Sequence, residues 1–443
     1  MKHRLLLLLF FPIALSAQDF NKEKLDSFFK SLGDNNKLMT GFSIRQDGVE
    51  VYQNSIGFAD VKQQLKANEN TKYRIGSITK TFTATIILQL VDDHLLNLED
   101  KLSKYFPQVP NAGNISLTQM LHHQSGLFNI TNDKQLEKWI TKPQSRKKML
   151  ERFAEHPSLF DPGTKTEYSN TNYILLSYIA EEVSGKSYSN LLQEKIIVPL
   201  GLTNTAYGKD IKPENNEALP YILHKGKWQQ PKVISDMSVP MGAGGIVSSP
   251  SDLTKFYTSL FTGKLVSEES LKTMTDTSTG MGMGLGSGAF SNIKGFGHDG
   301  AIDAFHSFAL YMPSKKASIA ITANAVNIEL MYVLQTATSI YFNEDVDLPQ
   351  FKPTKPFLQL SNEDLEKYDG VYSNADFPLK ITITHKNGQL SAQATGQGPF
   401  ALEAIEKDIF KSFEEMITLT FNVDDHTMTL HQLGFQDHLL KKE

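Results

Sequence analysis

A serine and a lysine stand three residues apart in the segment Gly-Ser-Ile-Thr-Lys at positions 76–80. If Ser77 lies in the first turn of a helix, its side chain shares a helix face with Lys80. A serine hydroxyl becomes an effective nucleophile when a neighbouring base removes its proton, and burial or nearby positive charge can lower the pKa of a lysine enough for that task. The pair therefore predicts nucleophilic catalysis by Ser77. An N-cap serine followed by a surface lysine is the alternative for an isolated match.

A tyrosine and an asparagine suited to the same chemistry occur in the tripeptide Tyr-Ser-Asn at positions 168–170. Beside a Lys80 cation, Tyr168 would be partly ionised and would relay protons to and from Ser77. Asn170 would hydrogen-bond Lys80 and a substrate amide. The alternative is a core aromatic followed by an N-cap pair. The tripeptide recurs at 188–190, but only the first copy follows an Asp-Pro-Gly turn, so we prefer Tyr168.

A third group of residues, His298, Asp299 and Gly300, precedes a pair of expected strands. His298 would donate a hydrogen bond to a substrate carboxylate or hold the Tyr168 oxygen in place. Gly300 would let a ligand backbone approach the strand edge. A structural histidine at a turn is the alternative. An Asp299 side chain that faced the site would disfavour a carboxylate-bearing substrate, but neighbours on a strand point to opposite sides.

The elements that must position these residues follow from hydrophobic spacing and turn signals. The expected helices are Phe20–Leu32, Ser77–Leu96, Leu117–Leu121, Leu136–His156, Thr171–Ser184 and Tyr188–Ile197. Strand hairpins are expected in Gly41–Ala59, around Asp47-Gly48, and over Phe305–Met312 with Ala317–Ala323. A helical block between two strand hairpins predicts an α+β fold, with one antiparallel sheet flanked by helices and a helical subdomain.

The C-terminal part of the chain has a different pattern. Residues 347–357 contain three prolines and few apolar side chains, which predicts a linker. Residues 358–443 predict a small all-β unit with short strands and polar turns. Its hairpins are expected over Leu379–Thr384 with Gln389–Ala394 and over Met416–Val423 with Thr427–Leu433.

The N-terminus has the pattern of a signal peptide. Lys2 and Arg4 give a basic start, an apolar run covers Leu5–Leu15, and small residues follow at 16–17. The run is shorter than the ~20 residues of a membrane-spanning helix. We therefore expect a signal peptide at 1–17, a first domain at 18–346, no transmembrane anchor after cleavage, and a periplasmic or secreted protein.

Composition excludes several classes of function. The 443 residues carry a formal net charge of -5, so no basic surplus indicates a nucleic-acid partner. The sequence has no cysteine, which excludes a thiol nucleophile, disulfides, thiolate metal sites and a lipoprotein anchor. His122 and His123 would point apart on a helix, so we interpret them as structural rather than as metal ligands. No cofactor and no metal are expected.

In this order, the serine-lysine pair, the Tyr-Ser-Asn motif and the His-Asp-Gly motif resemble the serine β-lactamase and penicillin-binding-protein family. The family includes class C β-lactamases, D-alanyl-D-alanine carboxypeptidases, D-aminopeptidases and related esterases. Residues 117–127 resemble its LLxHxSGL segment, and residues 240–249 resemble its glycine-rich GGxxS segment. The resemblance spans residues 20–342. The tail resembles the small lipocalin-like β-barrel often appended to these hydrolases, with its first strand at 365–372.

The resemblance implies a two-step acyl transfer through an acyl-serine. Lys80 and Tyr168 would deprotonate Ser77, which attacks a carbonyl carbon, and Tyr168 would then help water to release the acyl group. Backbone N–H groups of Ser77 and Ala301 would form the oxyanion hole. The residues implied to contact the substrate are Asn170, His298, Gly300 and Ala301.

Several activities of this family remain open for the chain. We expect an exported serine hydrolase of small acyl substrates, either a peptidase similar to D-alanyl-D-alanine carboxypeptidases and D-aminopeptidases or an esterase. A β-lactamase and a penicillin-recognising binding protein with little turnover are the alternatives. The chain has His-Asp-Gly at 298–300 where class C β-lactamases carry Lys-Thr-Gly, which disfavours β-lactam hydrolysis as the physiological reaction. The oligomeric state is open.

Overall fold

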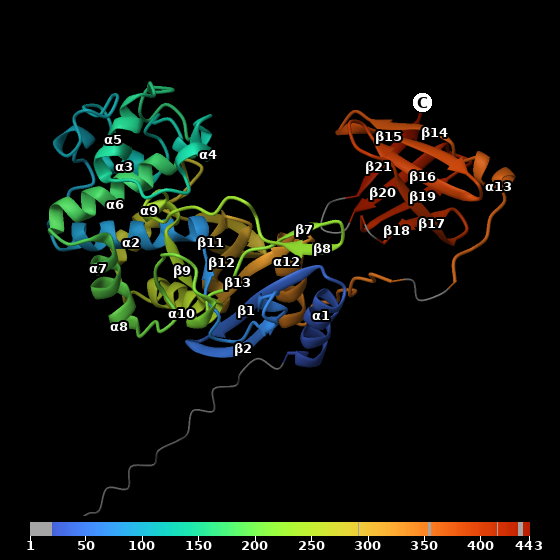
Figure 1. Cartoon of the computed structure of the whole chain (residues 1–443), viewed down its shortest axis with the longest axis horizontal. Coiled ribbons are helices and arrows are strands. Elements are labelled where there is room, and N and C mark those ends of the chain that lie inside the picture. The colour runs from blue at the N-terminus through green and yellow to red at the C-terminus, as the bar shows by residue number, and fades with distance from the viewer. Residues whose placement is uncertain (1–19, 291, 353–355, 414, 433–436) are drawn as a thin grey trace, which may run out of the picture. The chain divides into compact units, whose positions relative to one another are not determined.

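The computed structural model describes residues 20–290, 292–352, 356–413, 415–432 and 437–443, which form two compact units (Figure 1). The first unit contains residues 20–33, 38–326 and 340–343. The second contains residues 34–37, 327–339 and the chain from 344 onward. The predicted signal peptide at 1–17 and residues 353–355 of the predicted linker lie outside the described residues. The predicted domain limits at 18–346, 347–357 and 358–443 stay predictions.

The first unit is built on a six-stranded antiparallel sheet with the strand order β10-β11-β12-β13-β1-β2. The predicted N-terminal hairpin is confirmed as β1 (Leu38–Gln46) and β2 (Val49–Ile56). Its turn residues Asp47 and Gly48 both have positive φ, as an Asp-Gly hairpin turn requires. The later hairpin is confirmed as β12 (Phe305–Met312) and β13 (Ala317–Val326). β13 pairs with β1, so strands from both ends of the unit lie side by side.

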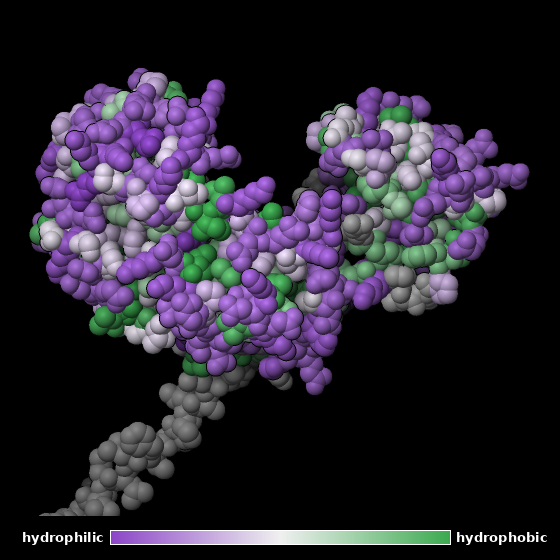
Figure 2. Space-filling view, in the orientation of Figure 1, coloured by the Kyte–Doolittle hydropathy of each residue, from purple (hydrophilic) through white to green (hydrophobic). Residues whose placement is uncertain are grey.

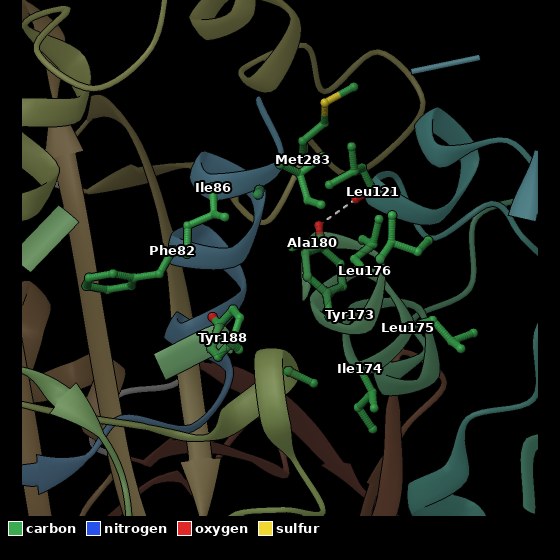
Figure 3. Packing of buried hydrophobic residues seen from close by; sticks show 14 of the residues in the cluster. Phe82, Ile86, Leu121, Tyr173, Ile174, Leu175, Leu176, Ala180, Tyr188 and Met283 are labelled. Carbon is green, nitrogen blue, oxygen red and sulfur yellow. Dashed lines mark hydrogen bonds between the residues drawn. The ribbon is translucent and has the colours of Figure 1, made fainter. Parts of the chain in front are cut away.

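Helices cover the sheet and form a separate helical part. α10 (Pro250–Phe261) packs against β13, β1 and β12, while α2 (Thr79–Asp92) packs against α6 (Asn170–Ser184) and α9 (Met241–Gly244). Figure 3 shows the apolar cluster between α2 and α6, where the Tyr173 hydroxyl donates to the Leu121 carbonyl oxygen at 2.7 Å. Most side chains of α2 are therefore buried.

Further helices and strands precede the barrel, and most of α12 (Leu330–Tyr341) belongs to the second unit. The other helices described before the barrel are α1 (Lys22–Asp34), α3 (Leu117–Leu121), α4 (Leu136–Trp139), α5 (Arg146–Ala154), α7 (Tyr188–Leu192), α8 (Val198–Leu200), α11 (Glu268–Met274) and α12 (Leu330–Tyr341). The other strands are β3 (Phe58–Asp60), β4 (Leu65–Lys66), β5 (Tyr73–Arg74), β6 (Ala206–Tyr207), β7 (Ile222–His224), β8 (Lys227–Gln229), β9 (Ile246–Ser248), β10 (Gly286–Phe290) and β11 (Ile293–Ile302).

Three predicted helices differ from the structure. The helix expected at 136–156 is two helices, α4 and α5, because Pro143 lies between them and Ser145 caps the second. The helix expected at 77–96 begins with a 3-10 turn over Gly76–Ile78, and α2 ends at Asp92. The helix expected at 188–197 is α-helical only to Leu192 and continues as a π-helical turn over Gln193–Ile197.

The second unit contains a closed antiparallel barrel of eight strands, in chain order and completed by pairing of the first strand with the last. Large side chains, among them Tyr372, Phe410, Phe421 and Met428, fill its interior. The strands are β14 (Gly370–Asn374), β15 (Phe377–Lys386), β16 (Gln389–Ala394), β17 (Phe400–Glu406), β18 (Ile409–Ser412), β19 (Ile417–Asn422), β20 (Thr427–Gln432) and β21 (His438–Lys442).

The predicted first barrel strand at 365–372 is only partly correct. Its N-terminal half belongs to the end of helix α13 (Asn362–Glu366) and the turn that follows, and β14 begins at Gly370. The reason is a capping box, in which the Ser361 side chain accepts from the Asp364 N–H while the Asp364 side chain accepts from the Ser361 N–H. Leu433, the last residue of the predicted strand at 427–433, lies outside the described residues.

Two glycines let strand β11 approach the 3-10 turn that precedes α2. A Cβ on Gly300 would lie 2.1 Å from the Ile75 carbonyl oxygen, and a Cβ on Gly76 would lie 2.8 Å from the Ala301 nitrogen. Gly76 also has a φ of +48°, in the left-handed region. The expectation that Gly300 leaves space for a ligand backbone is corrected, because the backbone that approaches it belongs to Ile75 of the same chain.

This close approach predicts a stability effect. We expect Gly300→Ala to lower the free energy of unfolding by about 1–3 kcal/mol, because the new methyl group must displace backbone atoms. Gly286→Ala in β10 is the matched control, since a Cβ there meets nothing within 4 Å. Denaturant unfolding followed by circular dichroism measures both variants, and an equal effect of the two substitutions would contradict the packing argument.

Candidate active site

Ser77 lies in the 3-10 turn between β5 and α2, and Lys80 lies in the first turn of α2. The Lys80 side chain is fully buried. Its Nζ atom lies 2.9 Å from Ser77 Oγ, 2.8 Å from Asn170 Oδ1 and 2.7 Å from the Ala243 carbonyl oxygen. The structure thus brings together the predicted residues Ser77, Lys80 and Asn170.

The protonation state of Lys80 follows from this environment. Burial lowers the pKa of Lys80 well below its ordinary value, and the charge of Asp299 opposes the shift only in part. A neutral amine has two N–H bonds, which Asn170 Oδ1 and the Ala243 carbonyl oxygen can both accept. The third tetrahedral position, which holds the lone pair, then faces the Ser77 hydroxyl. Lys80 is therefore arranged as a proton acceptor for Ser77.

Asn170 is oriented by residues that the sequence did not single out. Its Nδ2 atom donates to Asn129 Oδ1 at 3.2 Å and to Thr131 Oγ1 at 3.3 Å, which turns Oδ1 towards Lys80. The Asn170 backbone N–H also donates to Asn129 Oδ1, at 3.1 Å. The only sequence signal at Asn129 was a glycosylation-type tripeptide, which carries no information on this contact.

Tyr168 meets the nucleophile from another side. Its hydroxyl donates to Ser77 Oγ at 2.8 Å. Burial raises the pKa of Tyr168 above its ordinary value, and Asp299 raises it further, so the phenol stays protonated. The prediction of a partly ionised Tyr168 is therefore wrong, because burial raises the pKa of the phenol more than its hydrogen bond with Ser77 lowers it. The second tripeptide takes no part, since the Tyr188 hydroxyl bonds Thr83 Oγ1 at 2.6 Å.

His123 supports the Tyr168 ring. The two rings stack with centroids 4.4 Å apart. The Ser169 N–H donates to His123 Nδ1 at 3.1 Å, and burial lowers the pKa of His123 well below its ordinary value. A neutral imidazole therefore lies against the tyrosine. His122 instead contacts the Met281 carbonyl oxygen through Nδ1, at 2.7 Å. In the described part of the chain, no group of histidine, aspartate and glutamate side chains is arranged to hold a metal ion.

His298 is buried beside the site, with a ring centroid 6.3 Å from that of Tyr168. Its Nδ1 atom lies 2.6 Å from the Asp299 carbonyl oxygen, an acceptor, so Nδ1 carries the proton. Burial lowers the pKa of His298 to about 4. Its Nε2 atom has no hydrogen-bond partner among the described residues. Nε2 is then an acceptor, which differs from the predicted donation to a carboxylate, while a contact of His298 with the Tyr168 oxygen stays a prediction.

A cavity of about 260 Å³ opens beside Ser77. Asn170 and Ala301 line it together with apolar side chains, namely Ile130, Leu136, Ile140, Ile174, Val239 and Ile302. Figure 2 shows hydrophobic surface between the regions labelled α4 and β11 in Figure 1, which supply part of this lining. Asp303 also lines the cavity, but its carboxylate forms a buried salt bridge with Arg74. The wall is thus mainly apolar and without an unpaired charge at Asp303.

The chain is similar in sequence to known proteins. The beta-lactamase family model matches residues 26–332. The putative penicillin-binding protein PbpX of Bacillus subtilis is 32% identical over 253 residues, which are 57% of this chain and 61% of that protein. The chain thus spans about three fifths of the length of this relative.

Two further relatives extend the match. Penicillin-binding protein 4* of Bacillus subtilis is 25% identical over 402 residues, which cover 85% of this chain and 88% of that protein. Teichoic acid D-alanine hydrolase of Staphylococcus aureus is 27% identical over 258 residues, which cover 57% of this chain and 60% of that protein.

Solved structures share the fold. The D-amino acid amidase of Ochrobactrum anthropi SV3, complexed with D-phenylalanine, has a TM-score of 0.65 at 22% identity and covers 72% of this chain and 99% of that chain. The octameric penicillin-binding protein homologue from Pyrococcus abyssi has a TM-score of 0.65 at 24% identity and covers 95% of this chain and 99% of that chain. The family model covers more than half of the chain, and its matched residues contain the Ser77, Lys80 and Tyr168 cluster. The chain therefore belongs to the beta-lactamase family, a family of serine hydrolases.

Proposed function

We propose that this protein hydrolyses small acyl substrates through an acyl-Ser77 intermediate, as a peptidase similar to D-alanyl-D-alanine carboxypeptidases and D-aminopeptidases or as an esterase. The observation that carries the proposal is the buried Lys80 amine, whose Nζ atom lies 2.9 Å from Ser77 Oγ and also contacts Asn170 Oδ1 and the Ala243 carbonyl oxygen. A protein that only binds a ligand does not need a nucleophile and a base in this arrangement.

In the acylation step, Ser77 Oγ attacks the substrate carbonyl carbon while its proton passes to Lys80 Nζ. The bond between the carbonyl carbon and the leaving group then breaks. Tyr168 gives its hydroxyl proton to the leaving amine or alcohol, and Lys80 returns the Ser77 proton to the tyrosine oxygen. The products of this step are the free leaving group and an ester between Ser77 and the acyl group.

The negative charge on the carbonyl oxygen needs two donors. The backbone N–H groups of Ser77 and Ala301 suit this role because Gly76 allows the Ala301 nitrogen to come close to the turn that carries Ser77. Donors of this kind are each worth about 3–4 kcal/mol in the transition state. In the second step, water attacks the acyl carbon of the ester and gives a proton to the Lys80 and Tyr168 pair. The bond between that carbon and Ser77 Oγ breaks, the pair returns the proton to Ser77 Oγ, and the acyl group leaves as a carboxylic acid.

The apolar cavity beside Ser77 supports binding of an acyl group with a hydrophobic side chain. An engineered apolar cavity of about 150 Å³ holds benzene, so about 260 Å³ is more than a methyl group needs. The printed names of the Staphylococcus aureus hydrolase and of the Ochrobactrum anthropi amidase refer to D-alanine and D-amino acids. We therefore place acyl groups of D-amino acids first among the candidate substrates.

We also propose that the protein is exported. This proposal rests on the basic start, the apolar run and the small residues of the first 17 positions. Among the residues that the structure describes, no helix has the length and hydrophobicity to cross a membrane. Secretion of a full-length fusion from a bacterial host, with cleavage near residue 17 found by mass spectrometry, tests this part.

A fluorophosphonate probe tests the acyl-serine directly. We expect the intact protein to be labelled at Ser77 and Ser77→Ala to lose both labelling and hydrolysis, because the Ser77 hydroxyl lies 2.9 Å from the buried Lys80 amine. Rates with D-aminoacyl amides, D-Ala-D-Ala peptides, p-nitrophenyl esters and nitrocefin then rank the activities. Equal labelling of Ser77→Ala would contradict the proposal, and nitrocefin turnover far above the others would favour the β-lactamase alternative.

Removal of the Tyr168 hydroxyl tests the proton transfer to the leaving group. We expect Tyr168→Phe to reduce kcat/KM by about 10²–10⁴-fold, the usual contribution of a positioned acid or base. The midpoint of thermal unfolding should change little, because the ring still stacks on His123. Tyr188→Phe, in the repeated tripeptide, is the matched control and should retain activity. Equal rates for Tyr168→Phe and the parent protein would remove Tyr168 from the mechanism.

The lowered pKa of Lys80 predicts the direction of the pH profile. The reactive form is the neutral amine, so kcat/KM should rise with pH through the Lys80 pKa and level off well below 10.5, the ordinary value for lysine. Lys80→Arg should be inactive across this range, because a guanidinium stays protonated. Stopped-flow measurement of acylation against pH gives the profile. A rate that falls as the pH rises towards 10.5 contradicts Lys80 as the base.

A further inference from the structure

The Asp299 side chain is exposed on strand β11, next in sequence to His298. Along β11, His298 and Gly300 are buried, while Asp299 and Ala301 are exposed, as strand alternation requires. Ala301 lines the cavity with Ser77. Asp299 thus emerges from the same face of the strand, two residues, or about 7 Å, before Ala301.

The cavity identifies which part of a substrate lies near Asp299. Among the described residues, its lining includes Ser77, Asn170 and Ala301 to Asp303 but neither Tyr168 nor His298. In the proposed mechanism the acyl group occupies the cavity, and the leaving group takes its proton from Tyr168. The leaving group therefore departs on the side of Tyr168 and His298, and the Asp299 carboxylate lies 3.6 Å from His298 Nδ1.

The charge of Asp299 is not offset by a nearby cation. Its side chain is 79% exposed, and its carboxylate lies 3.6 Å from His298 Nδ1. That nitrogen belongs to a neutral ring and donates to a carbonyl oxygen. In the described part of the chain, no lysine or arginine forms a salt bridge with Asp299, whereas Asp303 is paired with Arg74. The field of Asp299 reaches the reacting groups, since it raises the pKa of both Lys80 and Tyr168.

We propose that Asp299 determines specificity for the charge of the leaving group, by disfavouring a carboxylate and favouring a neutral or cationic amine or alcohol. The inference rests on the proposed function and narrows it. A terminal D-alanine released by a carboxypeptidase carries a carboxylate, whereas the leaving groups of D-aminoacyl amides and of simple esters do not. The preferred substrates are therefore D-aminoacyl amides and simple esters, whose leaving groups carry no carboxylate.

The test uses esters with one acyl group and three leaving groups. The butyryl esters of 4-hydroxybenzoate, of its methyl ester and of 4-hydroxyphenyl-trimethylammonium have anionic, neutral and cationic leaving groups on the same ring. Because all three form the same acyl-enzyme, their kcat/KM values compare acylation alone. We expect Asp299→Asn to lower the neutral-to-anionic ratio of kcat/KM by about fivefold, the effect of one unit charge near 4 Å in water. Asp299→Lys should lower it further and should reduce the rate with the cationic ester.

Ionic strength and a matched variant separate charge from structure. Added salt should reduce the parent's preference towards that of Asp299→Asn, because exposed charges are screened. Asp47→Asn, in the β1–β2 turn three strands away across the sheet, removes an equal charge and keeps a favourable turn sequence. It should leave the ratio unchanged.

The outcomes distinguish the inference from the function on which it rests. Hydrolysis that persists in Ser77→Ala overturns the proposed function. Ser77-dependent hydrolysis with an unchanged neutral-to-anionic ratio in Asp299→Asn and Asp299→Lys overturns the role of Asp299 alone. D-alanyl-D-alanine and its C-terminal amide, measured in the same variants, repeat the comparison with an amine leaving group.

Discussion

The site depends on the burial of one amine. An ammonium group moved out of water into a protein interior carries a penalty of several kcal/mol. The fully buried Lys80 avoids that penalty in its neutral form, and two oxygen acceptors still satisfy its N–H bonds. The third direction is left to Ser77. The same burial thus determines the protonation state of the base and the direction in which its lone pair points.

The other groups around Ser77 are consistent with a neutral base. Tyr168 remains a phenol because burial raises its pKa. His123 and His298 also remain neutral, since burial lowers the pKa of both imidazoles. The exposed Asp299 carboxylate brings a negative charge to the edge of the site, 3.6 Å from His298 Nδ1. Burial therefore determines the protonation states inside the site, and an acidic side chain determines the charge at its edge.

Sequence patterns predicted the sheet, the main helices and the cluster of Ser77, Lys80, Tyr168 and Asn170, because these depend on local spacing and on the order of motifs. They did not predict the break in the helix at 136–156, where a proline interrupts a favourable hydrophobic pattern. They also missed the Ala243 carbonyl as an acceptor for Lys80, and the orientation of Asn170 by Asn129. Each of these contacts joins segments far apart in the chain, so no local pattern contains it. The phenolate was mispredicted because charge was considered without burial.

The buried Arg74 guanidinium holds both ends of one segment of the first unit. It donates to the carbonyl oxygens of Ser235 and Lys209, and it pairs with Asp303, which in turn accepts from the Ser235 N–H. Both ends of the chain segment 209–235 are thereby tied to the strand that leads into Ser77. One side chain therefore fixes two distant points of the chain. Loss of Arg74 would release both ends of the segment together and would leave the Asp303 carboxylate buried without its cation.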